Sequence, residues 1–231
     1  MPQSRGEMTM PEPAERRRFP RFQIQVPFLY TTHVPIPAVW EAGWTRSLGE
    51  SGATVELSER LRPRTAVQLR FRAEQGVVEV EAGVIWSGER VSEGGLVHGL
   101  SFTHIGRDDA QVLRKIFRPL PVMRRGGVRL PLDVRITCRP KNLAGTPLQG
   151  RTEDVTRGGL MLRLPRLVPP GTPLEVTLHA AKEPLTVDGV VVWVEPPEIW
   201  KPGESIGHGF QFTAPGWNSL AYLGLLAVKS S

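Results

Sequence analysis

The chain has 231 residues, of which 40% are hydrophobic and 23% charged, and these proportions are ordinary for a globular protein. Its net charge of +6 and its pI near 10.1 favour anionic partners without naming one. The single cysteine, Cys138, excludes an intrachain disulfide framework and fits a reducing cytoplasm. No stretch approaches the roughly 18 continuous apolar residues of a membrane-spanning helix, so we expect no such helix.

The first residues, 1–14, are polar and contain several prolines, without a periodic apolar pattern. We expect this segment to be disordered. It also lacks the apolar stretch that follows the basic residue of a secretory signal. Together with the unpaired cysteine, this predicts a cytoplasmic protein.

The first half of the chain then shows a run of short strands. Apolar and polar residues alternate over 22–29, which predicts a half-buried strand. Glycine, proline and serine separate four further strand candidates, at 53–57, 66–72, 77–86 and 98–103. Over 107–118 the apolar spacing becomes helical, with acidic residues in the first turn, where they favour the helix dipole.

The second half repeats this order. Strand candidates lie at 130–139, 159–164, 173–179, 185–194 and 208–213, and a closing helix is predicted over 217–229. The apolar residues of that helix cover more than one narrow stripe, which suggests two neighbours. One neighbour would be its own barrel, and the helix could instead form a dimer or partner surface. Short strands without intervening helices predict a small antiparallel barrel or sandwich in each half.

Four features occur in both halves in the same order: an arginine pair, a glycine turn, a Val-x-Trp segment and a late strand with glycine and phenylalanine. The offsets between matched residues are 108, 107 and 107 for Arg21 and Arg129, Gly52 and Gly159, and Trp86 and Trp193. A solenoid would repeat every 20–50 residues or so, so this period indicates a duplicated domain. We expect domains at 15–118 and 119–231.

The residue types of these motifs suit a guanine nucleotide. The planar fork of arginine can bond phosphate or the O6 and N7 acceptors of guanine, and its face can stack on a purine. A carboxylate can accept the guanine N1 and N2 hydrogens, a hydroxyl adds a further polar group, and glycine allows close approach of the backbone. The second half provides these groups at Asp154, Thr156, Gly158 and Gly159.

On these motifs both halves resemble PilZ domains, bacterial receptors for the second messenger cyclic di-GMP. The family is marked by Arg-x-x-x-Arg before a six-stranded barrel and by (Asp/Asn)-x-Ser-x-x-Gly on an early strand. The second half matches both motifs, with threonine in place of serine, at Arg125, Arg129, Asp154, Thr156 and Gly159. The resemblance implies a mainly β fold with two tandem six-stranded antiparallel barrels, each followed by a C-terminal helix.

The first half departs from the family pattern in its second motif. Arg17 and Arg21 match the arginines, but Ser47 stands in place of the acidic residue and Gly49 in place of the serine. Loss of the carboxylate leaves guanine donors less satisfied, at a cost of about 1–3 kcal/mol, or up to about a hundredfold in affinity. We therefore expect only a weaker site here, formed by Arg17, Arg18, Arg21, Ser47 and Gly52.

The resemblance also implies the principal binding residues and the function. The residues are Arg124, Arg125, Arg129, Asp154, Thr156, Gly158 and Gly159. The implied function is a cytoplasmic, non-enzymatic receptor with cyclic di-GMP as ligand and no cofactor. It would relay a domain rearrangement to an unidentified effector protein in motility, pilus or exopolysaccharide control.

Two alternatives remain. One is an adaptor that has lost messenger binding and acts through protein contacts alone. The other is a barrel pair for RNA or DNA, which the basic pI favours, although the intact second motif ranks a nucleic-acid polymer below the receptor. A steep loss of affinity with rising salt concentration would identify the RNA- or DNA-binding alternative. The sequence leaves a homodimer open.

Several other groups receive structural interpretations. Trp86 and Trp193 lie in apolar strands and are expected in the core, and Cys138 is expected to be buried. Arg60 and Arg64 share the arginine spacing but are predicted to lie in a solvated turn. The histidines have no metal-like spacing, and no catalytic motif stands out, so we predict neither a metal site nor an enzyme.

Overall fold

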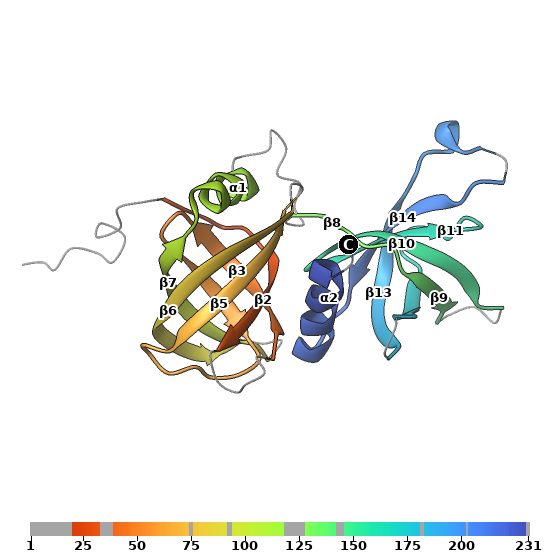
Figure 1. Cartoon of the computed structure of the whole chain (residues 1–231). Helices are drawn as coiled ribbons and strands as arrows, with labels where there is room; N and C mark the ends of the chain where they lie inside the picture. The colour runs from red at the N-terminus through yellow and green to blue at the C-terminus, as the bar shows by residue number, and fades with distance from the viewer. Residues whose placement is uncertain are drawn as a thin grey trace, which may run out of the picture.

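The computed structural model describes residues 20–32, 39–73, 76–91, 94–117, 128–141, 146–180, 183–201 and 203–229. These residues form two closed six-stranded antiparallel β-barrels, each followed by a helix (Figure 1). The fold class predicted from the sequence is thereby confirmed. The segment expected to be disordered, 1–14, lies outside the described residues.

The first barrel closes in the strand order β3-β2-β5-β6-β7-β4, with β4 pairing back to β3 and a short β1 attached to β3. Its strands are β1 (Arg21–Phe22), β2 (Pro27–Thr32), β3 (Glu41–Gly49), β4 (Gly52–Leu57), β5 (Ala66–Ala73), β6 (Gly76–Arg90) and β7 (Leu96–Ile105). Helix α1 (Arg107–Phe117) follows and lies over one end of the barrel (Figure 1).

The second barrel has the same topology, in the order β10-β9-β12-β13-β14-β11, with β11 pairing to β10 and a short β8 attached to β10. Its strands are β8 (Leu130–Pro131), β9 (Arg135–Pro140), β10 (Leu148–Thr156), β11 (Gly159–Leu164), β12 (Pro173–Leu178), β13 (Leu185–Val194) and β14 (Ile206–Phe212). A 3-10 helix, η1 (Pro197–Ile199), separates β13 from β14, and α2 (Trp217–Lys229) ends the described chain.

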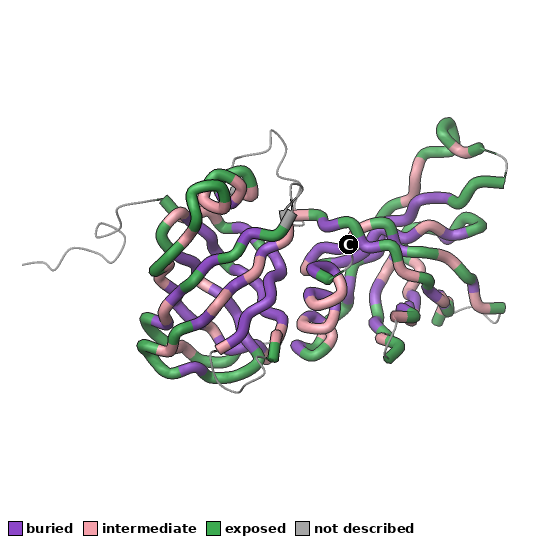
Figure 2. Tube along the Cα trace, viewed as in Figure 1, coloured by how far each residue is buried: buried purple, intermediate pink, exposed green. Residues whose placement is uncertain are grey.

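Each barrel has its own apolar interior, visible as buried segments that alternate with exposed ones along the strands (Figure 2). The first core is built around aromatic residues such as Phe28 and Phe71, whose ring centroids lie 5.3 Å apart. The second core is mainly aliphatic and includes Cys138. The prediction that Cys138 is buried is confirmed, and burial raises the pKa of its thiol to about 12.

A buried threonine occupies the same place in both barrels. The Oγ1 of Thr45 accepts a hydrogen bond from the N–H of Val26 at 2.9 Å, and the Oγ1 of Thr152 accepts one from the N–H of Val134 at 3.0 Å. Each hydroxyl therefore satisfies backbone that has left the strand ladder. Because this hydrogen bond replaces one of the strand ladder, the segments 22–29 and 130–139, each predicted as one strand, are divided into two.

The strand candidates also missed β3 and β10 entirely. Both contain a bulge, between Thr45 and Ser47 in β3 and between Thr152 and Asp154 in β10, which interrupts the apolar alternation. Strand β3 is in addition buried on both faces along most of its length. A strand of this kind lacks the period of two that identifies a half-buried strand.

Helix α2 lies between the two barrels (Figure 1). Leu223 and Ala227 belong to the core of the second barrel, whereas Trp217 and Leu220 pack against Trp44 of the first. The prediction that this helix has two neighbours is confirmed, and the two barrels are those neighbours. Since Trp44 is fully buried, the contact is a packed interface between the barrels.

Candidate functional site

The centre of the candidate site is an ion pair at the start of the second barrel. Arg129 directly precedes β8, and β8 pairs with β10 so that Pro131 lies opposite Asp154. The Nη1 of Arg129 donates to Oδ2 of Asp154 at 3.1 Å and to Oδ1 at 3.4 Å. Their side chains are 44% and 20% exposed, so both remain accessible to a ligand. The structure brings together two residues that the sequence assigned to one site.

The hairpin between β10 and β11 forms the adjoining wall, and its two glycines have different environments. A Cβ on Gly159 would lie 2.1 Å from the carbonyl oxygen of Phe210, so only glycine fits between these strands. A Cβ on Gly158 would meet nothing within 4 Å. The surface beside Gly158 is therefore open, whereas Gly159 is required by packing.

Thr156 is largely buried in the turn of this hairpin. Its Oγ1 accepts a hydrogen bond from the N–H of Gly158 at 3.2 Å and lies 3.4 Å from the carbonyl oxygen of Gly159, to which it donates. Its hydroxyl thus stabilises the turn. Thr156 and both glycines lie beside Asp154, as the motif predicts.

An exposed tryptophan shares the outer face with Asp154. Across the sheet Asp154 pairs with Met161, Met161 with Gly209, and Gly209 with Trp193. A Cβ on Gly209 would lie 2.0 Å from the indole Nε1 of Trp193, so the indole covers this glycine. Trp193 is 37% exposed. Its ring extends from β13 over β14, in the direction of β11, the strand that pairs with the strand of Asp154.

The prediction that Trp86 and Trp193 lie in the core is wrong. A bulge in β13 between Val191 and Trp193 turns the indole outward, and an equivalent bulge precedes Trp86, which is 43% exposed and covers Gly99. Glycine on the neighbouring strand leaves the room for each indole. The pairing of Val-x-Trp with a late strand glycine in both halves was the signal in the sequence.

The corresponding place in the first barrel has hydroxyl groups where the second has a carboxylate. Ser47, at the position of Asp154, is buried and pairs with Thr54, and Nη1 of Arg21 donates to the Oγ1 of Thr54 at 3.3 Å. Gly52 matches Gly159, since a Cβ there would lie 2.2 Å from a β7 carbonyl oxygen. The first hairpin is therefore preserved in shape but altered in chemistry.

Four of the predicted arginines cannot be placed. Arg17, Arg18, Arg124 and Arg125 lie outside the described residues. Each arginine motif is thus represented by its last member, Arg21 or Arg129.

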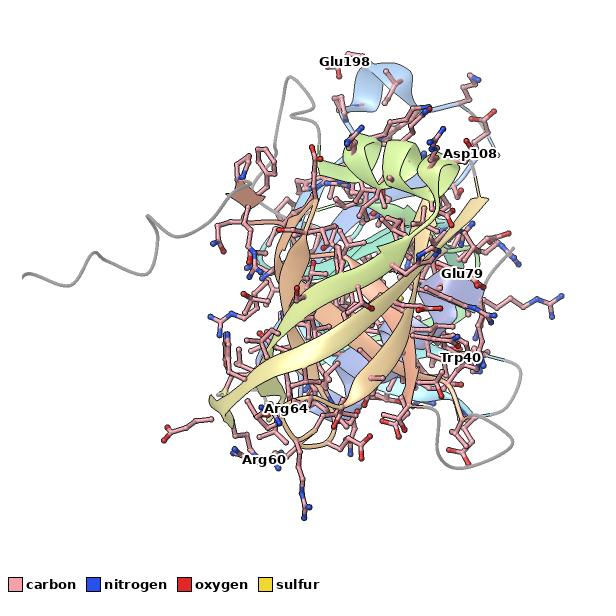
Figure 3. All side chains as sticks on the ribbon, turned by 60° about the vertical axis from the view of Figure 1, so that its left-hand side comes forward. Trp40, Arg60, Arg64, Glu79, Asp108 and Glu198 are labelled. Atoms are coloured by element: carbon pink, nitrogen blue, oxygen red, sulfur yellow. The ribbon has the colours of Figure 1, made fainter. Side chains whose placement is uncertain are left out.

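Arg60 and Arg64, which share the arginine spacing, belong to no site. They are exposed at the end of the first barrel opposite α1 and point away from it (Figure 3). Arg64 has a φ of 73°, within the left-handed region that turns adopt. The prediction of a solvated turn is confirmed.

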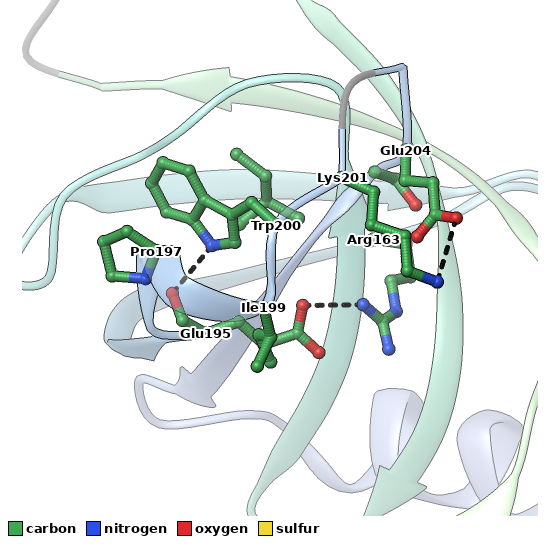
Figure 4. A pocket seen from close by; sticks show the side chains of 9 residues that line it. Arg163, Glu195, Pro197, Ile199, Trp200, Lys201 and Glu204 are labelled. Carbon is green, nitrogen blue, oxygen red and sulfur yellow. Dashed lines mark hydrogen bonds and ion pairs between the residues drawn. The ribbon is translucent and has the colours of Figure 1, made fainter.

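Two cavities on the second barrel are lined by neither Arg129 nor Asp154. Their volumes are about 610 and 630 Å³, and Arg163 lines both. Figure 4 shows the cavity of about 610 Å³. Nη1 of Arg163 pairs with Glu195 at 2.8 Å, and the indole N–H of Trp200 donates to the Glu195 carbonyl at 2.9 Å. Because these charges pair with one another, we assign the site to the open surface around Asp154.

Across the described ranges, no cluster of three or more histidine, cysteine or acidic side chains could hold a metal ion. None of the helices in the described part of the chain has the length and apolar character needed to span a membrane.

Comparison with known proteins identifies the family. Among solved structures, the Bacillus subtilis inhibitor of motility (MotI/DgrA) aligns at 10% identity over 90% of this chain and 97% of that chain, with a TM-score of 0.38. PlzA of Borreliella burgdorferi in complex with c-di-GMP aligns at 10% identity over 87% and 88%, with a TM-score of 0.35.

YcgR of Escherichia coli in complex with c-di-GMP aligns at 11% identity over 87% of this chain and 81% of that chain, with a TM-score of 0.36. No curated protein matches the sequence. The family model of the PilZ domain matches twice, at residues 15–118 and 123–220. The chain therefore belongs to the PilZ family, with two PilZ domains in tandem.

Proposed function

We propose that the protein is a receptor for cyclic di-GMP that binds the messenger mainly in its C-terminal domain. The observation that carries this proposal is the accessible Arg129–Asp154 pair beside an open glycine hairpin. A guanine offers paired acceptors to arginine on one edge and N–H donors to a carboxylate on the other. One positive and one negative group side by side suit both edges of the base.

The roles of individual residues follow from their chemistry. Both contacts from Arg129 to Asp154 use Nη1, so the fork can turn toward O6 and N7 of a guanine or toward a phosphate. Asp154 accepts from the guanine N1 and N2 hydrogens. Trp193 offers a face on which a purine can stack. Arg124 and Arg125 are proposed to add further contacts from the segment between the domains.

The N-terminal domain is proposed to bind weakly or to serve as the partner-facing domain. A buried serine replaces the carboxylate there, so guanine donors would lack their acceptor. We retain 15–118 and 119–231 as the proposed domain boundaries. The messenger is a ligand and not a cofactor, and the proposed activity is non-enzymatic relay to an effector protein, in the cytoplasm, in motility, pilus or exopolysaccharide control.

The interface around α2 limits the size of the proposed rearrangement. Relative movement is the default between domains unless their interface is large and apolar, and here Trp44, Trp217 and Leu220 are all buried between the barrels. We therefore propose a change at the edge of this interface and not a separation of the barrels. The same packing favours, as a second candidate, an adaptor that acts through protein contacts without ligand.

Calorimetry with cyclic di-GMP tests the proposal. Wild-type protein is expected to bind, and Arg129→Ala and Asp154→Ala are each expected to weaken binding by about tenfold to a hundredfold, because each removes a charged hydrogen-bonding partner. Arg139→Ala is the matched control, since Arg139 forms an exposed ion pair with Glu175 on the same barrel.

Absence of heat with wild-type protein at high micromolar messenger would favour the adaptor. Loss of binding only in Arg21→Ala would move the site to the N-terminal domain. Cyclic di-AMP, which lacks the guanine O6 and N2 groups, serves as the ligand control.

A further inference from the structure

The turn of the second hairpin carries an arginine that reaches into the first domain. Arg157 lies between Thr156 and Gly158, yet its Nη2 is 2.5 Å from Oε2 of Glu56 on β4. The two side chains are 10% and 5% exposed. The hairpin beside the proposed messenger site thus carries a residue that is bonded to a carboxylate of the other domain.

Glu56 belongs to the edge of the interface that α2 forms with the first barrel. It pairs across β3 and β4 with Trp44. A Cβ on Gly95 would lie 3.2 Å from Oε2 of Glu56 and 2.6 Å from the ring of Trp217, so the carboxylate and that indole flank the same glycine. The ion pair therefore joins the glycine hairpin to the packed indoles between the domains.

One nitrogen of the Arg157 guanidinium lacks a hydrogen-bond partner among the described residues. Nη1 of Arg157 is buried and has no hydrogen-bond acceptor within the described part of the chain. A buried N–H without an acceptor is costly, and such groups in native structures call for an explanation. Because Nη1 is buried, no ligand can reach it while the pair with Glu56 is closed.

Glu56 has a second cation available. Nε of Arg46 lies 3.6 Å from its Oε1, and the side chain of Arg46 is 49% exposed. If Arg157 leaves, Glu56 keeps a partner, so opening the pair does not strand a buried carboxylate. The surface next to Gly158, beside Arg157 in the turn, is open to receive a ligand.

We propose that Arg157 is a further messenger-binding residue, and that Glu56 competes with the messenger for its guanidinium. This inference rests on the proposed function. The phosphates of a bound dinucleotide would draw the guanidinium out of the interface and provide the acceptor that Nη1 lacks. Glu56 would then pair with Arg46 alone, and the contact between the hairpin and the first domain would be lost.

Thermodynamic linkage gives the consequence. If closing the Arg157–Glu56 pair opposes messenger binding, messenger binding opposes closing of the pair by the same factor. Messenger binding is thereby coupled to the edge of the domain interface, while the apolar contacts of α2 remain in place.

Calorimetry of four full-length variants with cyclic di-GMP tests the inference. Glu56→Gln is expected to bind at least about fivefold more tightly than wild type, since the competing charge is removed. Arg157→Gln is expected to bind more weakly than wild type. In the double variant, Glu56→Gln should produce no further change, because the cation for which it competes is gone. Glu50→Gln is the control: it removes the same charge from the same domain, from an exposed pair with Arg114, and should leave affinity unchanged.

Equal or weaker binding by Glu56→Gln, with wild type and Glu50→Gln binding alike, would overturn the competitor and leave the proposed function intact. If Glu56→Gln does not fold, Glu56→Asp keeps the buried charge but shortens its reach, and tighter binding is again required. A wild-type protein that gives no heat would overturn both proposals.

Discussion

The indole Nε1 of Trp44, in the first barrel, donates a hydrogen bond to the carbonyl oxygen of Leu220, in the helix that follows the second barrel, at 2.8 Å. Trp44 is fully buried, and Trp217 and Leu220 pack against it. The helix that follows the second barrel therefore also packs against the first. The contact makes the two domains one packed unit along α2.

Replacement of Trp44 should reduce the stability of this unit, by a smaller amount in Trp44→Phe than in Trp44→Ala. Trp44→Phe removes the hydrogen bond and should lower the free energy of unfolding by about 1 kcal/mol. Trp44→Ala leaves a cavity between the barrels and should lower it by about 3–5 kcal/mol. Urea unfolding of the full chain measures both. Trp86→Phe, at a half-exposed indole, is the control and should stay within about 0.5 kcal/mol of wild type. Equal effects at Trp44 and Trp86 would contradict a packed interface.

The two hairpin glycines give a matched pair. Gly159→Ala places a Cβ 2.1 Å from the Phe210 carbonyl oxygen, so the strands must move apart and the free energy of unfolding should fall by about 1–3 kcal/mol or more. Gly158→Ala meets nothing within 4 Å and should change it by less than about 0.5 kcal/mol. Thermal or urea unfolding distinguishes them. A large loss in Gly158→Ala would mean that the turn needs glycine for its backbone.

Stability should depend on pH through two equivalent histidines. His98 and His208 are fully buried, and each accepts a backbone N–H at Nε2, from Leu61 at 3.1 Å and from Val168 at 3.0 Å. Burial lowers the pKa of both imidazoles below the ordinary value. The unfolded chain therefore binds protons first as the pH falls.

The stabilisation by these histidines is fully present above pH 6.5 and is lost as the pH falls from there toward their folded pKa. Each imidazole can contribute a slope of at most about 1.4 kcal/mol per pH unit. Urea unfolding between pH 7.5 and about 5 should show this decline. A variant with both histidines replaced by glutamine should show a shallower one, whereas His104→Gln, at an exposed position, should match wild type. An unchanged slope in the double variant would assign the decline to other groups.

The resemblance to the family predicted the two barrels, and the motifs predicted that Arg129 and Asp154 lie together. Arg129 and Asp154 meet since β8 and β10 pair next to the motifs that carry them. The interface could not be predicted in this way, because Arg157 and Glu56 are 101 residues apart and the motif pattern specifies neither residue. In the first half, the position of Arg157 is occupied by Glu50, which pairs with Arg114 within its own domain. The two barrels are duplicated, but the contact between them is not.

The outward orientation of the two tryptophans, like the domain interface, could not be predicted from local patterns. An apolar strand predicts buried residues, and only the bulges turn Trp86 and Trp193 out over a glycine. Trp193 shares a cross-strand row with Asp154, whereas Trp86 shares one with the buried Ser47. If a guanine stacks on Trp193, Trp193→Ala should weaken cyclic di-GMP binding by about 1–3 kcal/mol, and Trp86→Ala should leave it nearly unchanged. Calorimetry on folded variants, checked by circular dichroism, measures both. Equal affinities for wild type and Trp193→Ala would exclude stacking there and confine recognition to the polar groups around Asp154.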